Sequence, residues 1–377
     1  MKILIAPDSF KGSLSALEVA KAIEKGIKKV DEHIETVIVP MADGGEGTVQ
    51  SLIDVSDGQL IETLAQDPLH RNIQSFYGIM GDGKTAVIEM AAASGLPLLK
   101  NEERNPLKTS TFGTGELIKD ALEKGCTSII LGLGGSATND GGTGMAQALG
   151  VRFLDENGLE LAMCGAELIN IHSVDMSGID DRLKGVNFIA ACDVDNPLCG
   201  EKGASNVYGR QKGATETDVQ ALDKGLAHFS EIMKKGYGFD YKNFPGAGAA
   251  GGLGYGVMCF LGAKLESGIE IVTRVTQLAD KMYGAELVFT GEGRIDSQTA
   301  YGKTPFGVAQ VAKQYNIPVI ALAGGLGDGY QELYSKGFDA IFSIIDKPMT
   351  LEEAIENSKT LIENITESII RLRNSLK

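Results

Sequence analysis

Residues 2–30 read KILIAPDSFKGSLSALEVAKAIEKGIKKV, and this stretch decides the fold. The apolar run Lys2–Ala6 stops at a proline, as a short buried strand does. Ser15 and Glu18 then form a capping box, which predicts that a helix begins there, and apolar residues recur at helical spacing through the rest of the stretch. The order strand, loop, helix is typical of one unit of a parallel α/β sheet.

The same rhythm continues through Thr36–Val39 and a following helix pattern, and it returns near the C-terminal end. We therefore expect both chain ends, residues 1–66 and 282–377, to build one Rossmann-like, doubly wound parallel-sheet domain. Residues 67–281 are expected to form an inserted α/β domain, with the active-site cleft between the two domains. The expected elements beyond the first 60 residues are a hairpin at 73–79 and 86–90, strands at 129–131, 188–191, 287–290, 319–323 and 340–345, and helices at 307–315 and 351–372.

The composition excludes several classes of protein. Lys and Arg number 35 and Asp and Glu number 50, which gives a net charge of −15. Such a chain has no general attraction for nucleic acid or an anionic membrane, so an anionic ligand must be held by local groups. The N-terminus resembles no signal peptide, no run of ~18 apolar residues occurs, and the odd, scattered cysteines suggest reduced thiols. We expect a cytoplasmic protein without nucleic-acid or membrane partners, and its oligomeric state stays open.

Glycine is unusually frequent, at 49 of 377 residues. The chain also contains one short glycine-rich internal repeat. Asp43–Leu52 and Asp140–Leu149 share the pattern DGGxGxxQxL, each after an apolar strand and at the start of a helix. Coincidence in a glycine-rich chain is the plain alternative. The functional interpretation is that the glycines free backbone N–H groups at two helix starts, one in each domain, to bind anions.

Two formal nucleotide motifs occur in the wrong context. Gly78–Thr85 matches the P-loop pattern, but strand-like residues follow where a helix is needed. Gly246–Gly251 matches GxGxxG, but no strand precedes it. The histidines have no metal-ligand spacing, Cys192 has no evident histidine partner, and no GxSxG elbow is present, so hydrolase and thiol chemistry lose their support.

Acidic residues in glycine-rich loops after predicted strands are more informative. Each alone is ordinarily a turn former, but their repetition suggests that they hold Mg²⁺ or accept a proton from an attacking hydroxyl. Three bases beside glycines, Lys11, Lys212 and Arg294, are candidates for neutralising phosphate or carboxylate charge. Together these groups fit phosphoryl transfer. The acidic and amide residues are Asp8, Asp43, Asn139, Asp140, Asp193, Asp195, Glu292 and Asp296.

These loops resemble those of the bacterial type I glycerate kinase family. The matching blocks, in chain order from Lys2 onward, are IAPDSFKGSLSA, PMADGGEGT, LGLGGSATNDGGTG, ACDVDNPLCG, GAGAAGGLGYG and TGEGRIDSQTAYGKTP. The resemblance implies ATP-dependent phosphorylation of D-glycerate to 2-phosphoglycerate with Mg²⁺, on a Rossmann-like domain with an inserted domain. One departure is the block Tyr208–Ala214, where Arg210 stands in place of an expected proline, so we give Lys212 little weight.

The resemblance assigns roles to individual residues. In the catalytic group, Asp193 or Asp43 accepts the proton of the glycerate hydroxyl, Lys11 meets phosphate and Arg294 grips the glycerate carboxylate. Glu46 is expected to face the cleft with Asp43. The expected metal ligands are Asp43, Asp193 and Asp296. The expected ATP-binding residues are Asp8, Ser9, Gly134, Gly135, Ser136, Asn139, Asp140, Gly141, Gly142 and Glu292.

Two alternatives stay open at this point. The same loops are compatible with a kinase that forms 3-phosphoglycerate, because a shift of ~1 Å changes which hydroxyl faces the phosphate. A non-enzymatic two-lobed binder of a small acidic metabolite also fits a central cleft.

Overall fold

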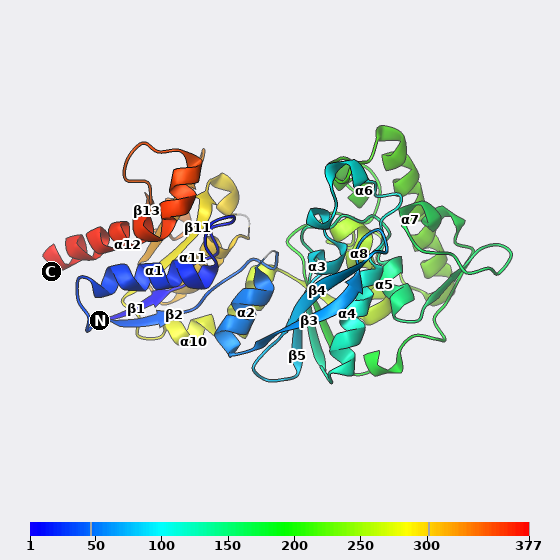
Figure 1. Ribbon diagram of the computed structural model, residues 1–377, viewed down its shortest axis with the longest axis horizontal. Coiled ribbons are helices and arrows are strands. Elements are labelled where there is room, and N and C mark those ends of the chain that lie inside the picture. The colour runs from blue at the N-terminus through cyan, green and yellow to red at the C-terminus, as the bar shows by residue number, and fades with distance from the viewer. Residues whose placement is uncertain (46, 301, 377) are drawn as a thin grey trace. The chain divides into compact units, whose positions relative to one another are not determined.

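The computed structural model describes residues 1–45, 47–300 and 302–376. Contacts divide the chain into two compact units. Unit 1 contains 1–43, 50–57 and 267–377, and unit 2 contains 44–49 and 58–266. Each unit has a sheet of its own (Figure 1).

Unit 1 is built on a five-stranded sheet of order β13-β12-β11-β1-β2, in which neighbouring strands run parallel. Its first helix begins at the predicted capping box: Glu18 N–H donates to the Ser15 hydroxyl, and Ser15 N–H donates to the Glu18 carboxylate. Helix α12 lies alongside α1 (Figure 1), where Lys25 forms an ion pair with Glu363. The elements are β1 (Lys2–Ile5), α1 (Ala16–Lys28), β2 (Glu35–Ile38), α2 (Thr48–Ser56), α9 (Gly268–Val275), α10 (Leu278–Met282), β11 (Leu287–Ile295), α11 (Thr304–Gln314), β12 (Val319–Leu326), β13 (Ala340–Ser343) and α12 (Leu351–Ser375).

Unit 2 is built on a six-stranded mixed sheet of order β10-β9-β6-β5-β4-β3. Strands β5, β6, β9 and β10 run parallel, and β3, β4 and β5 are antiparallel neighbours. The elements are β3 (Gln59–Gln66), β4 (Asn72–Ile79), β5 (Thr85–Glu89), α3 (Ala91–Ser94), α4 (Phe112–Glu123), β6 (Ser128–Gly132), α5 (Thr143–Ala148), β7 (Arg152–Leu154), β8 (Ser173–Asp175), β9 (Asn187–Ala191), α6 (Ala204–Tyr208), α7 (Glu216–Tyr237), α8 (Ala249–Leu261) and β10 (Lys264–Glu266).

The predicted fold class is confirmed. Strands β4 and β5 form the predicted hairpin, so the P-loop-like segment Gly78–Thr85 leads into a strand and not into a helix. The strands expected after the hairpin are also present. The domain boundaries need correction. A boundary between residues 66 and 67 would separate β3 from β4, although these strands pair along their whole length. A boundary between 281 and 282 would cut α10, and the helices from Ser267 onward belong to unit 1.

No helix in the described part of the chain combines the length and the apolar character needed to cross a membrane.

Candidate active site

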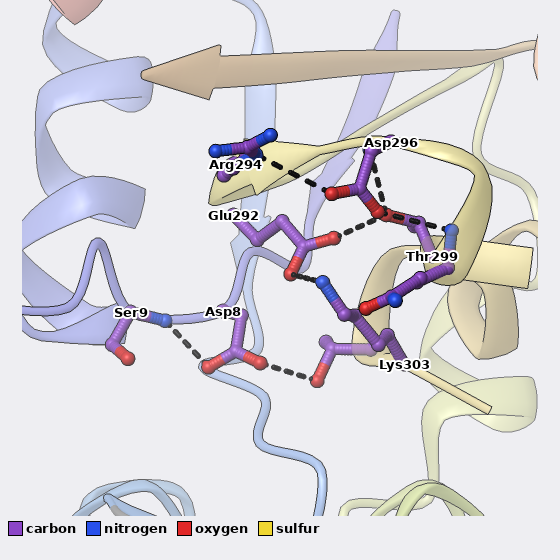
Figure 2. Close-up of polar contacts among 9 residues, drawn as sticks. Asp8, Ser9, Glu292, Arg294, Asp296, Thr299 and Lys303 are labelled. Carbon is purple, nitrogen blue, oxygen red and sulfur yellow. Dashed lines mark hydrogen bonds and ion pairs between the residues drawn. The ribbon is translucent and has the colours of Figure 1, made fainter. Parts of the chain in front are cut away.

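The carboxyl ends of β1 and β11 bring a buried carboxylate, Asp8, to the edge of the unit 1 sheet. These strands are parallel neighbours, and Asp8 N–H donates to Gly291 O at 2.8 Å. The Asp8 side chain is only 8% exposed. Its Oδ1 accepts a bond from Ser9 N–H at 2.6 Å and its Oδ2 accepts one from the Thr304 hydroxyl at 2.6 Å (Figure 2). The loop after β1 and the start of α11 therefore meet at one carboxylate.

Burial raises the pKa of Asp8 from its ordinary value of 3.8 to about 7, and the negative charges of Asp43 and Glu292 add to the shift. The bonds from Thr304 and Ser9 act in the opposite direction but do not cancel it. A carboxyl group with a pKa near neutral is suited to exchange protons at physiological pH.

Glu292, at the carboxyl end of β11, lies beside two groups on the loop that leads to α11. Its carboxylate accepts a bond from the Thr299 hydroxyl at 2.7 Å and forms an ion pair with Lys303 at 3.2 Å (Figure 2). Burial raises the pKa of Glu292, and Lys303 opposes this shift. Lys303, Thr299 and Thr304 were missed as site residues, although the block TGEGRIDSQTAYGKTP contains them.

The remaining predicted residues of unit 1 are more accessible. Arg294 is 73% exposed, and its Nε lies 3.3 Å from Asp296 Oδ2 (Figure 2). Lys11 is exposed and Asp43 is half-buried. The Asp43 charge acts on both Asp8 and Glu292, which places it in the same electrostatic environment. Glu46 lies outside the described residues.

In unit 2, the glycine-rich loop after β6 has an exposed part and a buried part. Gly134 and Gly135 are exposed, whereas 136–142 are buried. Gly135 has a φ of +74°, which strongly favours glycine. Within the described part of the chain, the N–H groups of Gly134 and Gly135 have no hydrogen-bond acceptor. Two accessible amides in succession are typical of an anion-binding turn.

Asp193 lies at the same edge of the unit 2 sheet as this turn. It follows β9, which runs parallel to β6, and Leu133 N–H donates to Ala191 O at 3.2 Å. Asp193 and Asp195 are both exposed. Gly134, Gly135 and Asp193 therefore occupy the carboxyl edge of parallel strands, where α/β proteins bind ligands.

Asp140 was predicted to bind the cofactor, but the structure turns it inward. Its carboxylate is fully buried and accepts bonds from Thr111 N–H and the Thr111 hydroxyl, both at 2.7 Å, and from Gly142 and Gly144 N–H at 3.2 Å. Burial raises its pKa, and these bonds oppose the shift. Asp140 is an internal anchor between the starts of α4 and α5, without a surface for a ligand.

The residues next to Asp140 in the sequence are also buried and form hydrogen bonds within unit 2. Gly141 N–H donates to Gly251 O at 3.0 Å, and Gly142 N–H donates to Asp140. A Cβ at Gly142 would lie 3.0 Å from Gly256 Cα, so glycine here allows close packing. Asn139 is buried and donates to the Ser205 hydroxyl at 3.0 Å.

The sequence predicts anion sites at the two DGGxG helix starts, and in the structure a carboxylate of the chain binds a backbone N–H at each of them. In the first repeat, Val49 N–H donates to the Glu89 carboxylate at 2.9 Å. In the second repeat, Gly144 N–H donates at 3.2 Å to the carboxylate of Asp140, the first residue of the repeat itself. The repeats were expected to lie one in each domain, but residues 44–49 and the second repeat both belong to unit 2.

Lys212, to which we gave little weight, is buried behind the 134–138 turn. Its ammonium group donates to the Ser136 hydroxyl at 2.6 Å and to Thr138 O at 2.7 Å. Only 2% of Lys212 is exposed.

The described residues contain no group of three or more His, Cys, Asp or Glu side chains arranged as a metal site. Of the three predicted metal ligands, Asp43 and Asp296 belong to unit 1 and Asp193 belongs to unit 2.

Comparison with known proteins places the chain among the kinases. It is 52% identical to a protein named glycerate kinase from Halalkalibacterium halodurans, over 97% of each chain. It is also 52% identical to glycerate 2-kinase of Escherichia coli K12, over 95% of this chain and 94% of that one. A crystal structure described as a candidate glycerate kinase 2 from Salmonella typhimurium LT2 matches with a TM-score of 0.92 and 46% identity, covering 100% of this chain and 98% of that one.

The profile of the Glycerate kinase family matches residues 3–374. The chain belongs to this family.

Proposed function

We propose that this kinase transfers the γ-phosphoryl group of ATP to O2 of D-glycerate and releases 2-phosphoglycerate and ADP. The observation that carries the proposal is the similarity to a glycerate 2-kinase along nearly the whole of both chains. The residues at the carboxyl ends of the parallel strands support the proposal in both units. In each unit, acidic side chains lie at the same sheet edge as exposed groups that can bind an anion. The proposal includes a cytoplasmic location, where ATP is plentiful.

The first experiment measures ADP release in a coupled assay with Mg-ATP alone and with Mg-ATP plus D-glycerate. ADP release that depends on glycerate is expected. Binding of both ligands without such release would identify a non-catalytic binder and overturn the proposal.

The reaction needs a group that accepts the proton of the attacking hydroxyl. The sequence points to Asp43 or Asp193, and the structure favours adding Asp8 to these candidates. Asp8 is a buried carboxyl at the sheet edge, and its oxygens accept bonds from Ser9 N–H and the Thr304 hydroxyl. Its pKa of about 7 allows it to take a proton during turnover and return it to water.

We propose that Mg²⁺ arrives with the phosphates of ATP and is held by one or two protein carboxylates. The residues fit such an ion, because Asp8, Asp43 and Glu292 are carboxylates that act on one another electrostatically. Burial raises the pKa of Asp8 and of Glu292, and repulsion between these carboxylates raises both further. Asp43 is the preferred ligand in unit 1. Asp296 is less suited, because Arg294 already neutralises it. In unit 2 the candidate is Asp193. The ion would neutralise charge that develops on the phosphoryl oxygens.

ATP phosphates are proposed to bind the unpartnered amides of Gly134 and Gly135. Lys11 and Ser9, in the loop after β1, are the proposed phosphate contacts of unit 1. Asp140, Gly141 and Gly142 are withdrawn as direct contacts, because their polar groups bond within unit 2. Asn139 is withdrawn because it is fully buried and its side-chain NH₂ donates to Ser205.

Arg294 is proposed to bind the glycerate carboxylate, since an exposed guanidinium can form two parallel bonds to it. Loss of charged hydrogen bonds of this kind predicts that Arg294→Met raises the KM for glycerate by ~10–100-fold and changes the KM for ATP little. Initial-rate kinetics with each substrate varied in turn measures this. The matched control is Arg371→Met, an exposed arginine paired with Glu367 on α12, for which no change is expected. Equal effects on both KM values would contradict the assignment.

Asp193→Asn distinguishes the two sequence-derived bases. If Asp193 accepts the proton, kcat falls by ~10²–10⁴, because that is the usual contribution of a general base. Glu156→Gln, an exposed carboxylate elsewhere in unit 2, serves as the control and should retain wild-type turnover. A kcat for Asp193→Asn within ~10-fold of wild type removes Asp193 as the base and leaves the carboxylates of unit 1.

A further inference from the structure

Lys212 is a fully enclosed lysine whose position is set by the short helical turn Arg210–Lys212. Lys212 N–H donates to Gly209 O at 3.0 Å, and the turn ends at Gly213 with a φ of +93°. An added Cβ at Gly213 would lie 2.2 Å from Arg104 O, so the turn is fixed by close backbone packing. The side chain is thereby directed into unit 2 rather than toward solvent.

Both hydrogen bonds of the Lys212 ammonium group within residues 1–45, 47–300 and 302–376 go to one loop, the loop whose exposed part is Gly134 and Gly135. The ammonium group donates to the Ser136 hydroxyl and to Thr138 O, the residues directly after that exposed part. The loop is held from its other side as well, because Leu96 N–H donates to Gly135 O at 2.8 Å and Ala137 N–H donates to Ser94 O at 2.9 Å. The two glycine amides are therefore fixed in place while remaining accessible.

A buried ammonium ion is costly unless it is compensated, and Lys212 has no ion pair within hydrogen-bonding distance among the described residues. Asp140 is the charged group that acts on it, and burial still lowers the pKa of Lys212 from 10.5 to about 7. A positive charge behind two accessible amides is favourable for an anion outside the loop.

We propose that Lys212 is a positioning residue for the ATP phosphates: it fixes the 134–138 turn and places a positive charge behind the amides of Gly134 and Gly135. This inference rests on the proposed function only in naming ATP as the anion. Lys212 does not touch the nucleotide and acts through Ser136 and Thr138.

The test is Lys212→Met, with ATP affinity measured directly by calorimetry in the absence of glycerate. The affinity is expected to fall by ~10–100-fold, the range for losing charge-assisted bonds, while the KM for glycerate changes less than ~3-fold. Arg210→Met is the matched control: Arg210 belongs to the same turn but is exposed and pairs with Glu216, so ATP affinity should not change. Wild-type affinity in Lys212→Met overturns the inference.

A pH series separates the charge from a merely structural role. Wild-type ATP affinity should weaken from pH ~6 to ~8 as Lys212 loses its proton. This change should exceed the one seen in Lys212→Met, which reports the titration of ATP and of other groups such as Asp8. Parallel pH profiles for the two proteins contradict the inference. If Lys212→Met does not unfold cooperatively, the variant Ser136→Ala is used in its place. We expect its affinity for ATP to fall by ~3–10-fold, and a change below ~2-fold would contradict the inference. Failure of the wild type to phosphorylate glycerate refutes the proposed function alone, because ATP binding is read without glycerate.

Discussion

Asp8→Asn is expected to lower kcat by ~10²–10⁴ and, at the same time, to make the protein more stable at pH 8. The loss of turnover follows if Asp8 exchanges the substrate proton, since an amide cannot accept it. The gain in stability follows from burial: at pH 8 the folded protein must keep a carboxylate ionised in a site that raises its pKa from 3.8 to about 7. Asparagine retains the size of the side chain and removes this cost.

The sign of the pH dependence follows from proton binding. Between pH ~4 and ~7 the folded state holds a proton on Asp8 that the unfolded chain has released, so the free energy of unfolding falls as pH rises through this range. The Asp8→Asn protein should therefore match wild type near pH 4 and exceed it by about 1–4 kcal/mol at pH 8. Urea unfolding without Mg²⁺ or nucleotide, at both pH values, measures this difference.

The control for Asp8 is Asp31→Asn, an exposed carboxylate of unit 1 that accepts a bond from His33 N–H. Neither turnover nor stability should change in this variant. Wild-type kcat in Asp8→Asn would remove the residue from catalysis. Reduced stability at pH 8 would show that its hydrogen bonds to Thr304 and Ser9 outweigh the cost of burying its charge.

Asp140→Ala is expected to cause the largest loss of stability, about 3–5 kcal/mol, because several buried donors lose their acceptor at once. The donors are Thr111 N–H and hydroxyl, Gly142 N–H and Gly144 N–H, which belong to the starts of two helices. Urea unfolding at pH 7 measures the effect.

Asp155→Ala is the matched control, since Asp155 also accepts two backbone bonds, from Asn157 and Leu159, but in an exposed turn. It should be far less destabilising than Asp140→Ala. A stable Asp140→Ala protein with weakened ATP binding would restore Asp140 as a cofactor residue and contradict its role as an internal anchor.

The fold was largely predictable because its strands and helices carry local signals. The capping box at Ser15 and Glu18 marks the start of α1, and short apolar runs mark the buried strands. The boundaries were less predictable. Strand β3 reads QLIETLAQ, a half-polar pattern that assigns it to neither domain, and only its antiparallel pairing with β4 places it in unit 2.

The candidate site was predictable as a set of strand ends but not in the direction of its side chains. A glycine-flanked aspartate looks the same in sequence whether it faces a ligand or, like Asp140, two helix starts. Lys212 is the converse case, since a lysine between Gln and Gly gives no local sign that tertiary packing encloses it. Thr304, at the start of α11, lies almost 300 residues from its partner Asp8, and no local pattern links the two.

The measurement that tests the central claim most directly is proton-coupled phosphorus NMR of the product formed from Mg-ATP and D-glycerate. A phosphate on O2 is attached to a carbon with one hydrogen, so we predict a new doublet that grows with the ADP signals and requires both substrates. A triplet, from a phosphate on the CH₂ carbon, would mean that the enzyme forms 3-phosphoglycerate. The absence of any glycerate-dependent phosphate signal would contradict the assignment of this chain as a glycerate-phosphorylating enzyme.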